Sequence, residues 1–197
     1  LSYGDPSTSA FISIHNMASW MIDRFGSDDL KGRYLPSLVT MDKMASYCLT
    51  EPGSGSDAAA LRTRAVRDGD DWIVNGQKTW TTLGQFADWI FCLARTNPDV
   101  KKQAGISMFL FPMDTPGVIR SKKLEKLGMH ASDTALLTFE DVRVPITNCL
   151  GEEGMGFIYL MSQLPQERLS IAVSTMASSQ KAFDDTVAFV KERKAFK

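Results

Sequence analysis

The spacing of hydrophobic residues changes twice along this chain, and the change limits the folds that the chain can adopt. Between residues 7 and 24, apolar residues recur every three or four positions, as on one face of a helix. From Met44 to about Pro145 they alternate with polar residues, which is typical of strands, and after Gly151 the helical spacing returns. The pattern predicts an α+β fold with a helical lead-in, a central antiparallel β sandwich or barrel, and long carboxyl-terminal helices.

The same pattern divides the chain into three segments, which we expect to be helical over 1–43, a β domain over 44–150, and helical again over 151–197. Polar turns separate the expected strands; the turn at 67–71 contains an Asp-Gly pair, which supplies the positive φ angles of a hairpin. The strands are expected near 44–50, 61–67, 71–81, 88–95, 105–112 and 134–140, with shorter ones near 118–128.

Prolines and caps predict where the helices begin and end. Ser27 is a suitable N-cap for a short helix that Pro36 limits. Pro165 lies inside the last helical pattern, where it predicts either one long kinked helix or two helices. The sequence begins at Leu1 without Met and stops at Lys197 within a helical pattern, and we interpret it as the central piece of a longer protein.

Charge and composition argue against several classes of function. The 197 residues include 22 basic and 23 acidic side chains without runs of either sign, so no nucleic-acid-binding surface is predicted. No apolar run approaches the ~20 residues of a membrane span. The three cysteines lie far apart and the two histidines lack ligand spacing, which favours buried thiols in a reducing compartment and predicts no metal site.

One stretch carries the clearest chemical signal, residues 47–57, with the sequence YCLTEPGSGSD. A strand-like run leads into a loop with two glycines, two serines and a proline. Glycines let backbone N–H groups approach a ligand closely, and hydroxyls add donors beside them. This chemistry suits a phosphate or a planar ring with polar edges. A polar turn between two strands is the alternative.

This stretch resembles the signature of the acyl-CoA dehydrogenase family, flavoenzymes that oxidise acyl thioesters between Cα and Cβ. The resemblance continues in order along the chain through residues 75–82 (NGQKTWTT), 139–145 (FEDVRVP) and 192–196 (ERKAF). It implies that residues 1–43 end an amino-terminal helical domain, that 44–150 hold the flavin and acyl-CoA site, and that 151–197 begin a carboxyl-terminal helical bundle.

The resemblance implies FAD as cofactor and assigns residues to it. Backbone groups and hydroxyls can satisfy the polar edge of the ring, and Trp80 offers a flat face, although a lone tryptophan is more often part of a core. Ser56 is expected to reach the acyl-CoA as well. The residues implied to line the isoalloxazine and ribityl region are Tyr47, Leu49, Thr50, Gly55, Ser56, Trp80 and Thr82.

The candidate catalytic base is Glu167. Residues 163–169 (QLPQERL) are similar to the segment in which long-chain and isovaleryl members carry their catalytic glutamate. Other members carry that glutamate on a later helix, beyond this chain, and the plain alternative is an exposed glutamate paired with a cation. Arg168 matches an arginine that the family uses within the site, and it is expected to pair there and help to position substrate.

Two residues near the end of the chain are expected to act on a neighbouring subunit. Arg193 and Phe196 match residues that reach the adenosine end of the partner's flavin, although Lys197 stands where the family usually has glycine. The resemblance therefore implies a homo-oligomer, a dimer or tetramer, in the full-length protein.

The implied function is FAD-dependent α,β-dehydrogenation of an acyl-CoA thioester, with electrons passed to an electron-transfer flavoprotein. The implied location is the cytoplasm of a bacterium or the mitochondrial matrix of a eukaryote, and we expect this piece alone to be inactive. Residues 82–89 resemble dicarboxylyl-CoA members, unlike the base segment, so no acyl chain is assigned. The alternatives are an acyl-CoA oxidase or flavin monooxygenase on the same fold, or a non-catalytic binding or assembly relative.

Overall fold

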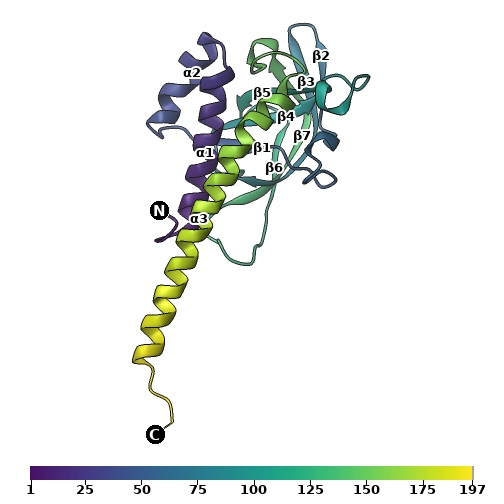
Figure 1. Ribbon diagram of the computed structural model, residues 1–197. Helices are drawn as coiled ribbons and strands as arrows, with labels where there is room; N and C mark the ends of the chain where they lie inside the picture. Colours follow the sequence, from purple (N-terminus) through teal and green to yellow (C-terminus); the bar gives the residue numbers. More distant parts are fainter. Residues whose placement is uncertain (197) are drawn as a thin grey trace.

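A computed structural model describes residues 1–196, and the predicted α+β fold is confirmed. Within these residues, strands occur only between Ala45 and Pro145, and the α-helices lie on either side (Figure 1). The elements in chain order are α1 (Pro6–Phe25), α2 (Asp28–Val39), β1 (Ala45–Cys48), β2 (Arg64–Asp68), β3 (Asp71–Thr82), β4 (Trp89–Arg95), β5 (Ile106–Pro112), β6 (Val118–Lys123), β7 (Thr134–Pro145) and α3 (Gly156–Glu192).

The strands form one curled sheet with the order β1-β4-β2-β3-β7-β6, and β5 pairs with β4 off this path. It differs from the expected antiparallel arrangement in one respect, because β1 and β2 both run parallel to β4. Parallel neighbours need a crossover connection. Here the β2–β3 hairpin supplies the crossover between β1 and β4 in place of a helix. The hairpin turn itself is as predicted, with Gly69 at a φ of 60°.

Strands β4 and β5 separate two hydrophobic cores, because side chains on a strand point alternately to its two faces. On one face, Ile90 and Cys92 pack inside the curl of the sheet with Phe109. On the other, Phe91 and Leu93 pack against the helices. Strands buried on both faces read as nearly continuous apolar runs, which is the pattern of both strands.

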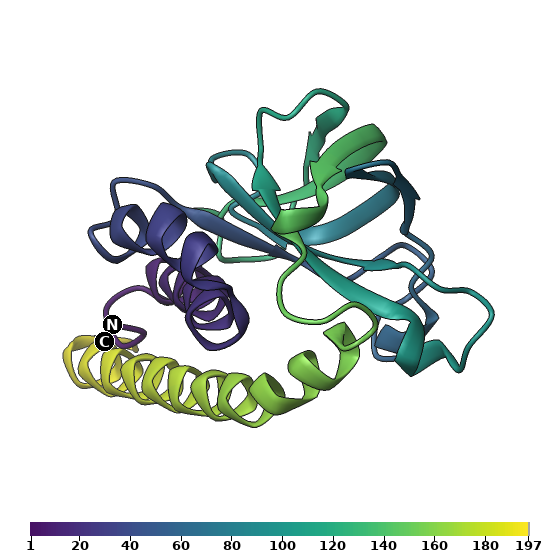
Figure 2. The same ribbon diagram turned by 90° about the horizontal axis from the view of Figure 1, so that it is seen from above.

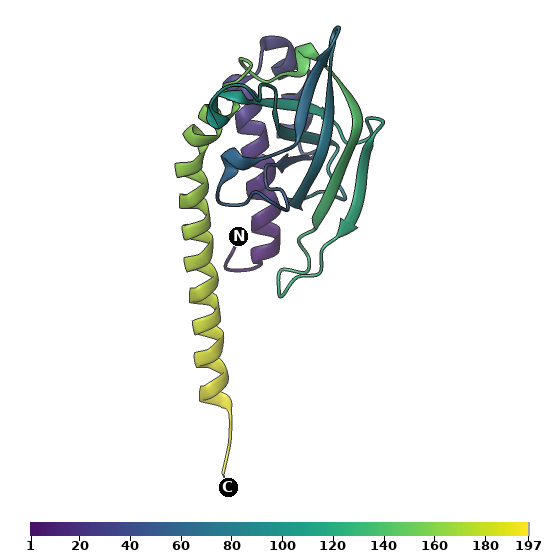
Figure 3. The same cartoon turned by 90° about the vertical axis from the view of Figure 1, so that its right-hand side faces the viewer.

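The helices lie on one side of the sheet (Figure 2). Helix α1 lies between the sheet and α3, and the carboxyl-terminal part of α3 projects beyond the rest of the molecule (Figure 3). The Tyr3 hydroxyl donates to the Asp184 carboxylate at 2.9 Å and ties the start of the chain to α3.

The start of α2 agrees with the sequence prediction, but its end does not. Ser27 caps α2 by accepting from the Leu30 N–H at 3.3 Å. The prediction that Pro36 limits this helix is wrong, since α2 continues to Val39 with Pro36 in its last turn, where only one intrahelical bond is lost. Pro165 lies within a single helix, α3, so the two-helix alternative is excluded.

Candidate functional site

The residues predicted to bind flavin come from two segments that the sheet brings together, 47–56 and 80–82. The Ser46 hydroxyl of β1 donates to the Thr82 carbonyl of β3 at 2.7 Å. The Thr79 N–H donates to the Thr50 carbonyl at 2.9 Å. These bonds join β1 and the loop after it to the end of β3, so the two sequence motifs form one surface region.

A buried ion pair that the sequence reasoning missed lies beneath this region. The Lys78 ammonium lies 2.8 Å from a Glu51 carboxylate oxygen, and the two side chains are 0% and 6% exposed. Burial alone would raise the pKa of Glu51, but the ammonium and the hydrogen bonds that it accepts hold the pKa below its ordinary value. The burial of Lys78 could have been predicted from the sequence. Trp72, Val74 and Lys78 are an even number of positions apart, so alternation along β3 points all three side chains to its buried face.

Trp80 is presented to solvent by an irregularity in β3. In a regular strand Trp80 and Lys78 would point to the same face. The register shifts between Lys78 and Thr81, and Trp80 has a φ of 57°, a left-handed conformation that is costly for a bulky residue. As a result Lys78 is fully buried while the Trp80 side chain is 58% exposed. Backbone strain of this kind clusters at functional sites.

The other predicted flavin residues leave groups available for a ligand. Thr50 and Thr82 use their carbonyls in the contacts above, and their hydroxyls form no hydrogen bond among residues 1–196. Gly55 and Ser56 are exposed in the loop, and a Cβ at Gly55 would meet nothing within 4 Å. The Tyr47 hydroxyl is buried and has no hydrogen-bond partner within residues 1–196. An exposed ring, two hydroxyls and an open glycine loop fit the ring and ribityl chain of a flavin.

Glu167 lies on α3 and lines a cavity of about 490 Å³ between α3 and α1. Cavities of this size accommodate small-molecule ligands. Gln163, one turn earlier, lines the same cavity and is 4% exposed. Its amide oxygen has no partner among the described residues. The cavity thus combines a carboxylate with an unpaired amide, and apolar side chains such as Ile12 and Val173 complete its walls.

The electrostatics of Glu167 suit a proton acceptor. Burial raises the pKa of Glu167, and the positive charge of Arg168 offsets only part of the rise. The pKa of the Tyr47 phenol is raised well above its ordinary value by burial, with a further contribution from the negative charge of Glu167. None of the residues predicted to bind flavin lines the cavity that Glu167 lines. Arg168 is exposed and forms no ion pair among residues 1–196, so its predicted pairing in the site is not seen.

Arg193 and Phe196 do not join this site. Arg193 follows the last residue of α3 and lies over the ring of Phe189, with its guanidinium carbon 6.0 Å from the ring centroid. The Phe196 side chain is fully exposed. Both follow the carboxyl-terminal end of α3, which projects away from the sheet (Figure 1).

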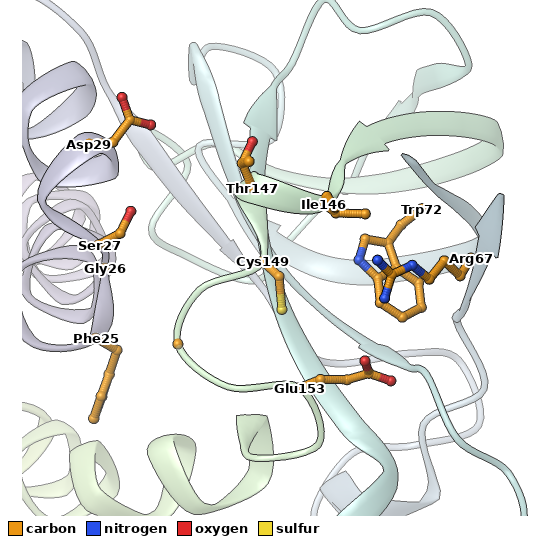
Figure 4. A pocket seen from close by; sticks show the side chains of 11 residues that line it. Phe25, Gly26, Ser27, Asp29, Arg67, Trp72, Ile146, Thr147, Cys149 and Glu153 are labelled. Carbon is orange, nitrogen blue, oxygen red and sulfur yellow. The ribbon is translucent and has the colours of Figure 1, made fainter. Parts of the chain in front are cut away.

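A larger cavity of about 820 Å³ lies elsewhere, and none of the predicted site residues lines it. Figure 4 shows Trp72, Arg67, Cys149 and Glu153 around it. Burial, together with the nearby charge of Glu153, raises the pKa of the Cys149 thiol to about 11. The thiol therefore stays protonated near neutral pH and makes a poor nucleophile. Volume alone does not identify the reactive site in this molecule.

Residues 1–196 contain neither a metal-binding cluster nor a membrane-spanning helix. No three His, Cys, Asp or Glu side chains among them are close enough to hold a metal ion together. No helix in the same range has the length and apolar content needed to cross a bilayer.

Known proteins are related to this chain by sequence. It is 45% identical over 196 residues to the mitochondrial isobutyryl-CoA dehydrogenase of Dictyostelium discoideum, which is 100% of this chain and 47% of that protein. It is 43% identical over 176 residues to the mitochondrial long-chain specific acyl-CoA dehydrogenase of Sus scrofa, 89% of this chain and 41% of that protein. The chain thus spans about half the length of these relatives.

Structural comparison and family descriptions agree with the sequence relatives. The crystal structure of acyl-CoA dehydrogenase from Geobacillus kaustophilus superimposes with a TM-score of 0.92 at 45% identity, covering 95% of this chain and 50% of that chain. Residues 1–42, 46–142 and 154–197 match, in order, the amino-terminal, middle and carboxyl-terminal domains of acyl-CoA dehydrogenases. The resemblance read from the motifs is therefore confirmed, and the chain belongs to the acyl-CoA dehydrogenase family.

Proposed function

We propose that the complete protein is an FAD-dependent acyl-CoA dehydrogenase, which removes a proton from Cα of an acyl-CoA thioester and a hydride from Cβ. The observation that carries this proposal is the position of Glu167. Its carboxylate lines a ligand-sized cavity between α1 and α3 and has a raised pKa. A carboxylate suited to accept a proton thus lines a cavity that can admit a small ligand.

The residues of the flavin-binding segment would hold FAD, which when bound supplies the acceptor for the hydride. The Thr50 and Thr82 hydroxyls and the loop at Gly55 and Ser56 would contact its polar edge and ribityl chain, and Trp80 would cover part of its ring. Tyr47 and Leu49 would pack against the same region. Ser56 would also contact the acyl-CoA.

Glu167 would take the α-proton. That proton is only weakly acidic, so the acceptor should be ionised yet basic, and a carboxylate whose pKa is raised toward the working pH satisfies both needs. Half-burial in the cavity is the cause of the raised pKa. Arg168, the next residue of α3, would help to position substrate.

The remaining assignments belong to the same proposal. Residues 1–43, 44–150 and 151–197 would be parts of an amino-terminal helical domain, a central β domain and a helical bundle. Arg193 and Phe196 would contact FAD of a partner subunit in a homo-oligomer. Electrons would pass to an electron-transfer flavoprotein. The protein would work in the mitochondrial matrix of a eukaryote or the cytoplasm of a bacterium.

The test is the Glu167→Gln variant of the complete enzyme, mixed anaerobically with acyl-CoA while the flavin absorbance is followed. We expect FAD and acyl-CoA to bind and flavin reduction to slow by about 10²–10⁴-fold, the usual contribution of a general base. Glu153→Gln, which changes a glutamate of the other cavity, is the matched control and should reduce its flavin at the parent rate. An unchanged rate in Glu167→Gln would place the base elsewhere.

A further inference from the structure

We infer that Lys78 and Glu51 are positioning residues for FAD: their buried ion pair holds the flavin-binding segment and Trp80 in the geometry that the cofactor needs. This inference rests on the proposed function, because it presumes that the segment binds FAD. Neither residue is itself expected to touch the reacting atoms. Both would act through the backbone of Leu49 and Thr50 and through the bulge at Trp80.

The Lys78 ammonium connects two segments that are far apart in the sequence. It donates to the Glu51 carboxylate at 2.8 Å and to the Leu49 carbonyl at 3.0 Å. The Thr79 N–H, next in the chain, donates to the Thr50 carbonyl at 2.9 Å. Lys78 and Thr79 of β3 thus fix the backbone at residues 49–51. Two of these three residues, Leu49 and Thr50, are assigned to the flavin.

The Glu51 carboxylate extends this connection to a third segment. One of its oxygens accepts from the Arg62 N–H at 2.6 Å, and the other accepts from the Thr63 N–H at 3.0 Å as well as from Lys78. Glu51 and Ser54 also exchange backbone hydrogen bonds at 3.0 Å in both directions. The loop is therefore closed on itself and attached to the start of β2 through one side chain.

The pair also explains how an exposed Trp80 is maintained. The backbone at Trp80 is in a left-handed conformation, which persists only when its surroundings hold it there. Lys78 is anchored two residues before Trp80, and Thr81, the residue after it, is buried. With Lys78 fixed on the inside and Thr81 buried behind it, the bulge must place Trp80 outside.

The hydrogen bonds made by the two charged groups are required for this arrangement, and apolar packing alone does not replace them. An apolar side chain of similar size at position 78 would fill the space but could not donate to the Leu49 carbonyl. A neutral glutamine at position 51 presents an N–H₂ group to donors where the carboxylate accepts three hydrogen bonds. The double replacement therefore leaves the interior electrically neutral, as it is in the parent, but removes the hydrogen bonds that shape the loop.

The experiment uses the complete protein, stripped of flavin and titrated with FAD. The variants are Lys78→Met, Glu51→Gln and the double variant. Lys43→Met is the matched control, since Lys43 also pairs with a carboxylate, Asp88 at 2.7 Å, but this pair is partly exposed and lies outside residues 47–56 and 80–82. Flavin fluorescence gives the Kd for FAD. The visible circular dichroism at saturating FAD reports the position of the ring, and the thermal midpoint of the flavin-free protein reports folding.

We expect the double variant to bind FAD about 10–100-fold more weakly, as is typical when outer residues that orient a site are lost. We also expect an altered circular dichroism of its bound flavin, with the parent signal retained by Lys43→Met. A Kd within about threefold of the parent, with an unchanged spectrum, would overturn the inference and leave the pair a purely structural one.

Two further outcomes separate the inference from the proposed function. If the double variant does not fold, Glu51→Gln decides by the same spectrum, because it keeps the size of the side chain: a parent-like signal overturns the inference and an altered one supports it. A parent protein that binds no FAD would overturn the proposed function and this inference with it. A parent that binds FAD, with variants that bind it equally well, overturns the inference alone.

Discussion

Two glutamates in this molecule lie in partly similar surroundings but have pKa values shifted in opposite directions. Glu51 is buried within residues 47–56, the segment proposed to bind flavin, yet its pKa is lowered because an ammonium and two backbone N–H groups stabilise its charge. Glu167 is only half-buried on α3, yet its pKa is raised because burial is offset only in part by Arg168. The difference shows that partners, more than depth, decide whether a carboxylate is fixed as an anion or available to take a proton.

The largest effect should follow from removal of the Glu51 carboxylate. Glu51→Leu leaves the Lys78 ammonium buried without its partner, and we expect a loss of about 3–5 kcal/mol in the free energy of unfolding. Urea denaturation of the flavin-free protein measures it. Glu140→Leu, at an exposed position of β7, is the control and should change stability by about 0.5 kcal/mol or less. An equally small loss for Glu51→Leu would mean that the ion pair contributes no net stability.

A smaller effect should appear as opposite pH dependences of stability. The lowered pKa of Glu51 means that its contribution is present above the ordinary value of 4.5 and is lost as the pH falls through the folded-state pKa. For Glu167, whose pKa is raised, the contribution is present below 4.5 and is lost as the pH rises through the folded-state pKa.

Thermal midpoints measured across the acidic and neutral range test both signs. Glu51→Gln should be less stable than the parent at neutral pH, with a gap that narrows in acid. Glu167→Gln should be the more stable protein at neutral pH, with an advantage that disappears below about pH 4.5. If the thermal midpoints of both variants changed with pH in the same way, the opposite pKa shifts of the two glutamates would be contradicted.

The smallest effect concerns Tyr47, whose pKa is raised by burial and, to a lesser extent, by the negative charge of Glu167. A buried hydroxyl without a partner costs about 1–3 kcal/mol of desolvation, so Tyr47→Phe should stabilise the flavin-free protein by about 1 kcal/mol. Chemical denaturation detects a change of this size. A loss of stability would instead show that the hydroxyl makes a hydrogen bond in the folded protein.

Most of the fold could be predicted from the sequence because local patterns determine it. The strands and helices follow hydrophobic periodicity, and motifs of the family are enough to single out Tyr47, Trp80 and Glu167. Two features differ from what the local patterns predicted. The parallel pairing of β1 with β4 follows from the route of the β2–β3 hairpin. The continuation of α2 past Pro36 follows from how little one lost hydrogen bond costs near a helix end.

The candidate site could be predicted less completely than the fold. The residues proposed to bind flavin come from motifs of the family. Glu51 and Lys78 lie in the same motifs without standing out, because a lysine in a strand is usually solvent-exposed. The alternation of β3 places Lys78 on the buried face, and a buried ammonium requires a carboxylate partner. Trp80 could not be placed outside by alternation, since the bulge reverses the face on which it lies.

The pairing of β3 with β7 has a consequence for the time at which this protein acquires its site. β3 ends at Thr82, and its partner β7 begins at Thr134, about 50 residues later. A ribosome adds about 5–20 residues per second, so during synthesis β3 waits roughly 3–10 s before its partner strand exists. Contacts between such distant segments also slow folding. The strand that carries Lys78 and Trp80 therefore has one open edge on the nascent chain, and this edge is where wrong pairing during synthesis would disrupt the site.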